Sequence, residues 1–446
     1  LPEPEEVDMM ADLVRQSFEE GAAGFSTGLE YWPGSQSSPE TIEPLCRVAT
    51  EFNRLYATHV RNRENIEKAA DGLDVVYLDT EYIAAPMFKL ARWLRGGEEV
   101  AWSTSMIMNY LPYLAFEREV WKHFKPALKA GDFDLVHRIT PMSPTLPSYI
   151  AHKLKLPFLI GPLNGNLDWP KAFQAEQARE KEKLRGLRNL YKFLPFARST
   201  YDRAAAVLTA FEHTRADLTR VEDAQIVMVP EIGFDPAIFH ADGTKPAGQR
   251  GTEGKMHFLY AGRLVPYKLP ELPIRAFAAS AALRGHHLHI LGSGPEEERM
   301  RAVIAEFGLQ DCVTLEGRKT QVEVAELMRK CDGFIFPSIR ELGAGVVIEA
   351  MACGMHCLVA DYGAPGALAA AGRGDAVPIA PLEEMVEGFT AALERCVAEP
   401  AYMEACALRG QAYAEGAFTW AQKGVHAEAL YRAVLAGEDL RRFNFS

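Results

Sequence analysis

The C-terminal half of the chain alternates short apolar segments with stretches of helical periodicity, regularly from residue 257 to residue 379. Apolar segments separated by helices predict a parallel sheet that is covered by helices on both faces. We therefore expect a doubly wound α/β domain, with helices that begin near Leu269, Pro295, Gln321 and Gly345. The predicted strands are His257 to Ala261, His287 to Leu291, Cys312 to Leu315, Gly333 to Phe336, Cys357 to Ala360 and Ala376 to Ile379.

The N-terminal half shows the same alternation, less regularly. Its predicted strands are residues 23–29, 55–60, 74–78, 134–137, 157–160, 204–208 and 225–230, with mostly helical sequence over 82–131 and a helix over 147–154. The polar, glycine-rich stretch 241–256 is typical of a linker between domains. We predict five parts: a β-α-β segment over 1–56, an N-terminal domain over 57–240, the linker 241–256, a C-terminal domain over 257–417, and a final helix with a tail over 418–446.

Charged and glycine-rich residues follow the predicted strands of the C-terminal half, and doubly wound sheets bind ligands at the carboxyl ends of their strands. Arg263 and Lys268 share one loop, where two cations suit a diphosphate. Glu341 and Glu349 bracket a glycine-rich turn and a helix start, where free N–H groups and the helix dipole favour an anion. The alternative is an ordinary surface loop with ion pairs.

The amino-acid composition limits the classes of molecule that this chain is expected to bind. A net charge of −12 argues against nucleic acid, because phosphate binding needs a basic face. No apolar run is long enough to span a membrane, and the seven cysteines lack metal-type spacing, so we expect buried thiols, no metal and a cytoplasmic protein. The chain begins with Leu1 rather than Met, and we expect it to be a fragment of something longer.

Residues 171–198 carry more basic than acidic side chains, with leucines interleaved. Such a helix packs its leucines on its own domain and presents a solvated basic face, or it lies peripherally on an anionic membrane surface. The first interpretation is favoured, and the membrane contact stays open.

Several motifs together resemble retaining glycosyltransferases of family 4, over about residues 57–435. They are Tyr260 to Arg263 with Lys268, Leu291 to Pro295, Val313 to Gly317, and Pro337 through Glu341 to Glu349 and Gly354. The resemblance implies a GT-B architecture, with two Rossmann-like doubly wound parallel-sheet domains facing across a cleft. The nucleotide sugar would bind the C-terminal domain, and the acceptor would enter from the N-terminal one.

The same resemblance implies a role for each site residue in moving a hexose, with retention, from a UDP- or GDP-sugar to a saccharide or lipid-linked acceptor without a metal. Glu341 and His137 would be catalytic, and Asn164 with Gly165 would lie on the acceptor side. The donor would be bound by Gly262, Arg263, Lys268, Gly294, Gly317, Arg318, Leu342, Gly343, Ala344, Gly345 and Glu349.

A second resemblance covers the start of the chain. Residues 20–29, 31–35 and 56–61 are similar to N-acyl-D-amino-acid deacylases of the amidohydrolase superfamily, in which the position of His59 is a metal ligand. Further ligands are missing from the sequence, so we expect His59 to be structural. The two resemblances overlap at residues 57–63, which a recombination or assembly joint would explain. Residues 1–56 stand where family 4 glycosyltransferases carry a glycine-rich loop, and that loop is missing here. Two alternatives therefore stay open. One is a chimera that binds nucleotide sugar without transferring it, and the other is a metal-dependent deacylase.

Overall fold

The computed structural model describes residues 109–179, 192–243, 248–251 and 254–443, with short pieces before them at 7, 11, 12, 15, 24–27, 55–58, 76, 78, 80, 82–84, 86, 87 and 90. The chain divides into two compact units, residues 1–79 and 80–446. In the first unit, β1 (Gly24–Thr27) pairs in parallel with β2 (Leu55–Thr58), which confirms two of the predicted strands.

We predicted a strand over residues 74–78, of which the structure describes residues 76 and 78. The prediction is wrong at both. Val76 and Leu78 lie in no strand, and Val76 is 40% exposed. An apolar residue that stays in water lacks the burial that makes strand pairing favourable.

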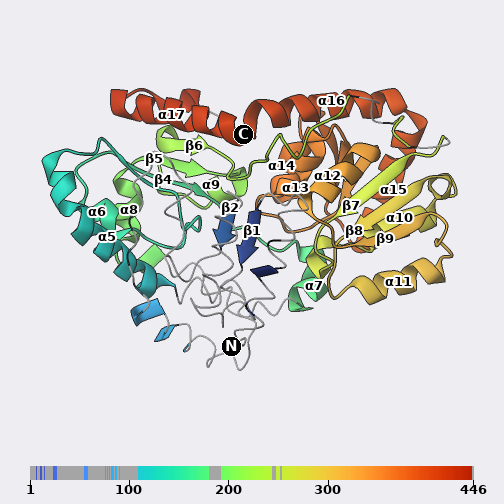
Figure 1. Cartoon of the computed structure of the whole chain (residues 1–446), viewed down its shortest axis with the longest axis horizontal. Coiled ribbons are helices and arrows are strands. Elements are labelled where there is room, and N and C mark those ends of the chain that lie inside the picture. Colours follow the sequence, from blue (N-terminus) through green and yellow to red (C-terminus); the bar gives the residue numbers. More distant parts are fainter. Residues whose placement is uncertain are drawn as a thin grey trace. The chain divides into compact units, whose positions relative to one another are not determined.

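The second unit contains a six-stranded parallel sheet, which confirms the α/β prediction for the C-terminal half (Figure 1). Its strands lie in the order β12-β11-β10-β7-β8-β9. They are β7 (His257–Ala261), β8 (His287–Leu291), β9 (Val313–Gly317), β10 (Gly333–Phe336), β11 (His356–Asp361) and β12 (Gly374–Pro378). The chain therefore runs outward in one direction from β7 and in the other direction from β10, so a topological switch point lies between these two neighbours.

Alternation along the strands divides this domain's core into two layers. Phe258 and Tyr260 of β7 face one hydrophobic cluster, while Leu259 and Ala261 face the other. The first layer is built with α10 (Leu272–Ala279), α11 (Glu297–Glu306) and α15 (Leu382–Ala398). The second is built with α12 (Gln321–Lys330), α13 (Gly345–Ala352), α14 (Gly363–Ala369) and part of α16 (Pro400–Ala417).

A second parallel sheet has four strands, in the order β3-β4-β5-β6. They are β3 (Val136–Arg138), β4 (Phe158–Leu163), β5 (Ala204–Thr209) and β6 (Ile226–Met228). One face packs against α5 (Tyr110–Ala130), α6 (Tyr149–Lys153) and neighbouring side chains of α8 (Ala197–Asp202). Two further helices of this half are α7 (Gln174–Arg179) and α9 (Glu212–Arg215).

The other face of the four-stranded sheet is covered by α17 (Trp420–Ala436), drawn in red in Figure 1. Leu430 and Ala433 of α17 pack against Leu159 and Leu208 of this sheet. The final helix therefore returns to the first domain, as the resemblance implied. Among the described residues, no helix combines the length and apolar character needed to cross a bilayer.

Candidate functional site

The loops that follow β7 and β10 meet at the switch point of the six-stranded sheet. The backbone N–H of Ile339 donates to the carbonyl of Tyr267 at 3.0 Å, and the hydroxyl of Ser338 reaches the same carbonyl at 3.4 Å. Because open α/β sheets bind ligands outside the strand ends at such a point, this is where a ligand is expected.

Lys268 and Glu341 come from these two loops and form an ion pair. Lys268 Nζ lies 2.5 Å from Glu341 Oε1, and the two side chains are only 13% and 15% exposed. The hydroxyl of Ser338 donates to the same carboxylate oxygen at 2.9 Å. The ammonium also lies over the ring of Phe336, 5.0 Å from its centroid. A half-buried pair of opposite charges thus occupies the position where the sequence predicted both residues.

Two glycines let the neighbouring loop approach the one that carries Lys268. A Cβ on Gly292, which has a φ of +139°, would lie 1.9 Å from the carbonyl oxygen of Gly262. A Cβ on Gly294 would lie 2.4 Å from the carbonyl oxygen of Leu264. Glycine is therefore required sterically at both positions, and the predicted donor-binding residue Gly294 lies against the β7 loop.

The turn before α13 adopts a left-handed conformation at Ala344, with a φ of 54°. A non-glycine residue pays roughly 1–2 kcal/mol for this conformation, so packing must hold it there. The turn presents the first N–H groups of α13, which have no partner within the helix. Leu342, Gly343, Ala344 and Gly345 therefore form a turn that leads into a helix start, and their predicted contact with an anion stays a prediction.

Glu349 lies on α13, four residues after Gly345 and hence on the same side of the helix as its first turn. Burial raises the pKa of its carboxyl group to about 7. Its side chain makes no hydrogen bond or ion pair with any part of the chain that the structure describes. A half-buried carboxyl group without a partner is available to hydroxyl donors of a ligand.

Asn164, which follows β4, connects the four-stranded sheet to the turn before α13. Its amide Nδ2 donates to Glu231 Oε1 at 2.5 Å and to the carbonyl of Leu342 at 2.9 Å. Its Oδ1 must then be an acceptor, so His213 Nε2, at 3.2 Å, donates to it. Burial lowers the pKa of His213 to about 4, which keeps the ring neutral near pH 7.

Glu231 was missed by the sequence prediction. Burial raises the pKa of its carboxyl group, and its Oε2 is buried without a hydrogen-bond partner among the described residues. A Cβ on Gly343 would lie 2.7 Å from Oε1 of Glu231, so the carboxyl group packs directly on the glycine-rich turn. Glu231 and His213 follow β6 and β5 of the four-stranded sheet, and applying the strand-end rule to that sheet would have found them.

The remaining predicted site residues differ in exposure and in position. Arg263 and Arg318 are exposed, and Gly317 ends β9 at the edge of the sheet, away from β10. Gly165 donates its backbone N–H to Thr214 Oγ1 at 3.1 Å. His59, residues 28–34 and residues 180–191 of the basic stretch 171–198 lie outside the described residues.

His137 has structural partners on both ring nitrogens. Nδ1 lies 2.7 Å from the hydroxyl of Tyr431 on α17, and Nε2 lies 2.7 Å from the carbonyl of Gly161. The imidazole thus connects β3, β4 and the final helix. Its predicted catalytic role stays a prediction.

Comparison with known proteins finds relatives of the C-terminal half. The family model described as glycosyl transferases group 1 matches residues 244–405. The D-inositol 3-phosphate glycosyltransferase of Stackebrandtia nassauensis is 31% identical over 160 residues, which are 33% of this chain and 36% of that protein. This chain therefore spans about a third of the length of that curated relative.

Solved structures resemble more of the chain. Sucrose-phosphate synthase from Thermosynechococcus elongatus aligns with a TM-score of 0.54 and 16% identity, over 94% of this chain and 97% of that one. The HepE protein of Anabaena, solved in complex with UDP, aligns with a TM-score of 0.51 and 17% identity, over 69% of this chain and 81% of that one. At such low sequence identity, these similarities show only that the folds are alike.

The comparison also finds the predicted resemblance to deacylases. The N-acyl-D-glutamate deacylase of Alcaligenes xylosoxydans xylosoxydans is 36% identical over 69 residues, which are 16% of this chain and 14% of that enzyme. Residues 244–405 thus match the group 1 glycosyl transferases, and the two parallel sheets have the GT-B architecture.

Proposed function

We propose that this chain is a retaining glycosyltransferase that moves a hexose from a UDP- or GDP-sugar to a saccharide or lipid-linked acceptor. The observation that carries this proposal is the Lys268–Glu341 pair at the switch point, in front of the N-terminus of α13. A cation, a carboxylate and a helix start at one sheet edge match the diphosphate and the sugar of such a donor.

In this proposal the protein stabilises the leaving diphosphate with fixed charges and dipoles. Lys268 exchanges its carboxylate partner for a diphosphate oxygen, and the exposed Arg263 on the same loop swings onto the diphosphate as well. The amides of residues 342–345 face the phosphate or the sugar. Preorganised groups of this kind supply much of the barrier lowering when negative charge develops on a leaving group.

The bond between the anomeric carbon and the diphosphate oxygen breaks, and its electron pair leaves with the nucleoside diphosphate. The acceptor hydroxyl forms the new bond on the same face of the sugar, and its proton passes to the leaving diphosphate. Glu341, released from Lys268, lies beside the transferred sugar and accepts hydrogen bonds from its hydroxyl groups. Glu349 accepts hydrogen bonds from the ribose.

On the acceptor side, Asn164 and Gly165 follow β4, and Asn164 bonds directly to the carbonyl of Leu342. This contact between the end of β4 in the four-stranded sheet and the turn before α13 supports an acceptor hydroxyl arriving here. HepE was solved with UDP, which makes uracil the first base to test. Gly317 and Arg318 would contact the donor only if it extends toward β9.

The first test measures binding. UDP and GDP are added separately to the purified chain, and the melting temperature is recorded. Ligand at 100 times its dissociation constant should stabilise the fold by about 2.7 kcal/mol. If neither nucleotide raises the melting temperature, the donor-site proposal is wrong.

The second test measures turnover and separates the transferase from a chimera that only binds. Wild-type protein and Glu341→Gln are incubated with UDP-glucose or GDP-mannose, and released nucleoside diphosphate is quantified. We expect the wild type to release diphosphate and Glu341→Gln to bind nucleotide but release at least tenfold less. Nucleotide binding without release by the wild type would instead support the binding-only chimera.

The deacylase alternative rests on the similarity of 69 residues at 36% identity. Because these residues are only 14% of that enzyme, most of a deacylase site would have to come from elsewhere in this chain. Hydrolysis of N-acyl-D-glutamate that is lost in His59→Asn would establish this alternative.

A further inference from the structure

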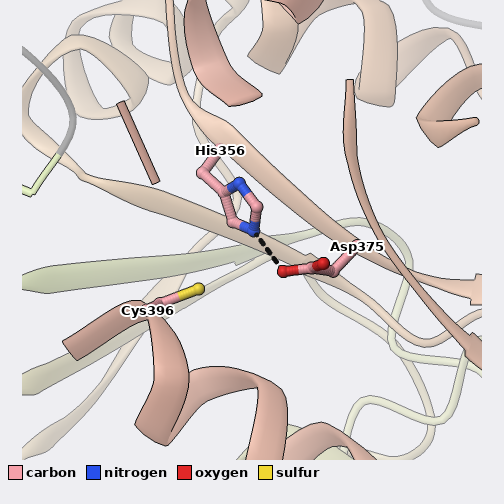
Figure 2. Close-up of side chains that lie close together, drawn as sticks. All are labelled: His356, Asp375 and Cys396. Carbon is pink, nitrogen blue, oxygen red and sulfur yellow. Dashed lines mark hydrogen bonds and ion pairs between the residues drawn. The ribbon is translucent and has the colours of Figure 1, made fainter. Parts of the chain in front are cut away.

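A buried cluster of potential metal ligands lies at the amino end of the six-stranded sheet, at the opposite end of the strands from Lys268 and Glu341. His356 is the first residue of β11, Asp375 is the second residue of β12, and Cys396 lies in the last turn of α15. One ligand atom from each of the three lies within 4.8 Å of the other two. Figure 2 shows the Cys396 thiol extending from its helix toward the His356–Asp375 pair.

Two of the three side chains are shielded from water, and the Asp375 side chain is 18% exposed. His356 is 1% exposed and Cys396 is 0% exposed. His356 Nε2 lies 3.1 Å from Asp375 Oδ2, whereas Nδ1 of the same ring is buried without a hydrogen-bond partner among the described residues. Nε2 is the nitrogen on the Asp375 side, so it is the imidazole atom that would bind a metal at this cluster.

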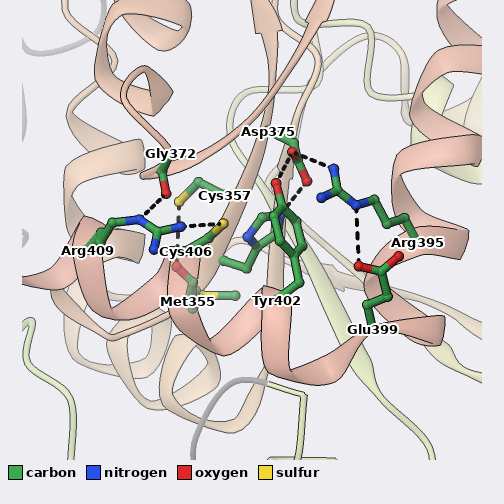
Figure 3. Close-up of polar contacts among 10 residues, drawn as sticks. Met355, Cys357, Gly372, Asp375, Arg395, Glu399, Tyr402, Cys406 and Arg409 are labelled. Atoms are coloured by element: carbon green, nitrogen blue, oxygen red, sulfur yellow. Dashed lines mark hydrogen bonds and ion pairs between the residues drawn. The ribbon is translucent and has the colours of Figure 1, made fainter.

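Asp375 is held in place from a second helix. The hydroxyl of Tyr402 on α16 donates to Asp375 Oδ1 at 2.7 Å, and Arg395 Nη1 lies 3.9 Å from the same oxygen. Figure 3 shows Tyr402 and Arg395 on either side of this carboxylate. With Oδ1 occupied in this way, Oδ2 is directed toward His356. Outer contacts of this kind orient the ligands in known metal sites.

The donor atoms suit zinc. Imidazole nitrogen, carboxylate oxygen and thiolate sulfur are the three ligand types that zinc takes, at distances of about 2.0–2.3 Å. Two ligands at about 2.0 Å from a tetrahedral ion lie roughly 3.3 Å apart, close to the observed separation between His356 and Asp375. One carboxylate and one thiolate balance the two charges of the ion, so the loaded site is neutral, as a dry interior requires.

We propose that His356, Asp375 and Cys396 bind one Zn²⁺ ion that connects β11, β12 and α15. The role is structural, because the site lies at the end of the strands away from the ligand-binding edge. We predicted no metal site from the sequence because no group of ligands had metal-type spacing along the chain. His356 and Asp375 are 19 positions apart in the sequence and meet only in the fold. The competing explanation is a buried His356–Asp375 ion pair that needs no metal.

The test begins with the wild-type full chain. Purified protein is analysed for metal content, and the metal is then exchanged for Co²⁺, whose absorption includes a charge-transfer band when a thiolate is bound. We expect about one zinc per chain and a cobalt–thiolate band. Cys396→Ser should abolish the band, and His356→Asn and Asp375→Asn should lower the zinc content at least tenfold.

Two matched variants keep the test specific. Cys312→Ser removes a thiol outside the cluster, and His59→Asn removes the residue that the deacylase resemblance would make a ligand. Both should keep the zinc and the cobalt–thiolate band. A chelator should lower the melting temperature of the wild type and leave that of Cys396→Ser unchanged.

Wild-type protein without zinc that also gives no cobalt–thiolate band would overturn the proposal and leave the ion pair as the explanation. Zinc that is lost in His59→Asn but kept in Cys396→Ser would overturn it equally. Neither result depends on glycosyl transfer, so failure of the zinc site and failure of the proposed function are distinguishable.

Discussion

Lys268 and Glu341 are 73 positions apart in the chain, yet their charged groups are 2.5 Å apart. Each group therefore satisfies the other when no donor is bound. In the proposed mechanism, a donor diphosphate attracts Lys268 away from this carboxylate, which is then free to meet the sugar. The pair would thus link donor binding to the position of the predicted catalytic group.

Replacing Lys268 with Ala should weaken UDP binding. A charge-assisted hydrogen bond contributes about 1.5–3 kcal/mol, so the dissociation constant should rise roughly 10- to 150-fold. Isothermal titration calorimetry measures this change. Lys330→Ala, which removes an exposed lysine at the end of α12, is the matched control and should bind UDP normally. Equal affinity of Lys268→Ala and wild type would remove Lys268 from the donor site.

Glu349 should make stability and nucleotide binding depend on pH in opposite directions. Burial raises the pKa of its carboxyl group from 4.5 to about 7. Folding therefore favours the protonated form, and the stability this contributes is complete below about pH 4.5 and is lost as pH rises through about 7. Nucleotide binding through the ionised carboxylate should increase over the same range.

The variant Glu349→Gln separates these effects. Its melting temperature should exceed that of the wild type at pH 8 and equal it near pH 4.5, while its UDP affinity at pH 8 should be lower. Glu387→Gln, which changes an exposed carboxylate on α15, should alter neither property. Unchanged UDP affinity of Glu349→Gln at pH 8 would show that the carboxylate does not hold the ribose.

Asn164→Ala should destabilise the fold, because it removes the donor to Glu231 and to the Leu342 carbonyl. Leaving buried acceptors unsatisfied costs about 1–3 kcal/mol, which urea unfolding can measure. Asn109→Ala, at the start of α5, is the control, since its side chain makes no capping bond. A double-mutant cycle with Glu231→Gln should show a coupling of at least about 0.5 kcal/mol, and strict additivity would contradict the contact.

His137 is tested by comparing two variants. Tyr431→Phe keeps the imidazole and removes its Nδ1 contact, whereas His137→Ala removes both contacts. If the histidine only tethers α17, both variants should increase hydrogen exchange in α17 and leave diphosphate release per folded molecule unchanged. Loss of release in His137→Ala alone would instead establish the predicted catalytic role.

A histidine cluster on β7 and β8 should make the fold sensitive to acid. His257 Nδ1 lies 3.0 Å from His289 Nε2, and burial followed by nearby histidines lowers the pKa of His287 to about 4. A lowered histidine pKa contributes stability above about pH 6.5 that is lost as pH falls toward 4. His287→Gln should therefore reduce the loss of melting temperature between these pH values, whereas the exposed-site control His240→Gln should not. Parallel pH profiles of wild type and His287→Gln would contradict this assignment.

Much of the fold follows from local patterns in the sequence. The six predicted strands of the C-terminal half are all present, because short buried apolar segments between helices have few other ways to satisfy their backbone groups. The turn around Gly343 and the helix that begins at Gly345 were also predicted from the positions of glycines. Val76 and Leu78 show the limit of such patterns, because apolar character alone does not show whether a segment is buried.

Contacts between distant residues depended on the tertiary structure. Local sequence patterns predicted the order of strands and helices and which charged residues follow strands, since these depend on neighbours in the chain. Only the folded sheets decided that Lys268 meets Glu341, that Asn164 reaches Leu342, and that His356, Asp375 and Cys396 converge. The physical reason is that strand order and helix packing arise from burial of the whole core, which joins strand ends irrespective of their separation in sequence.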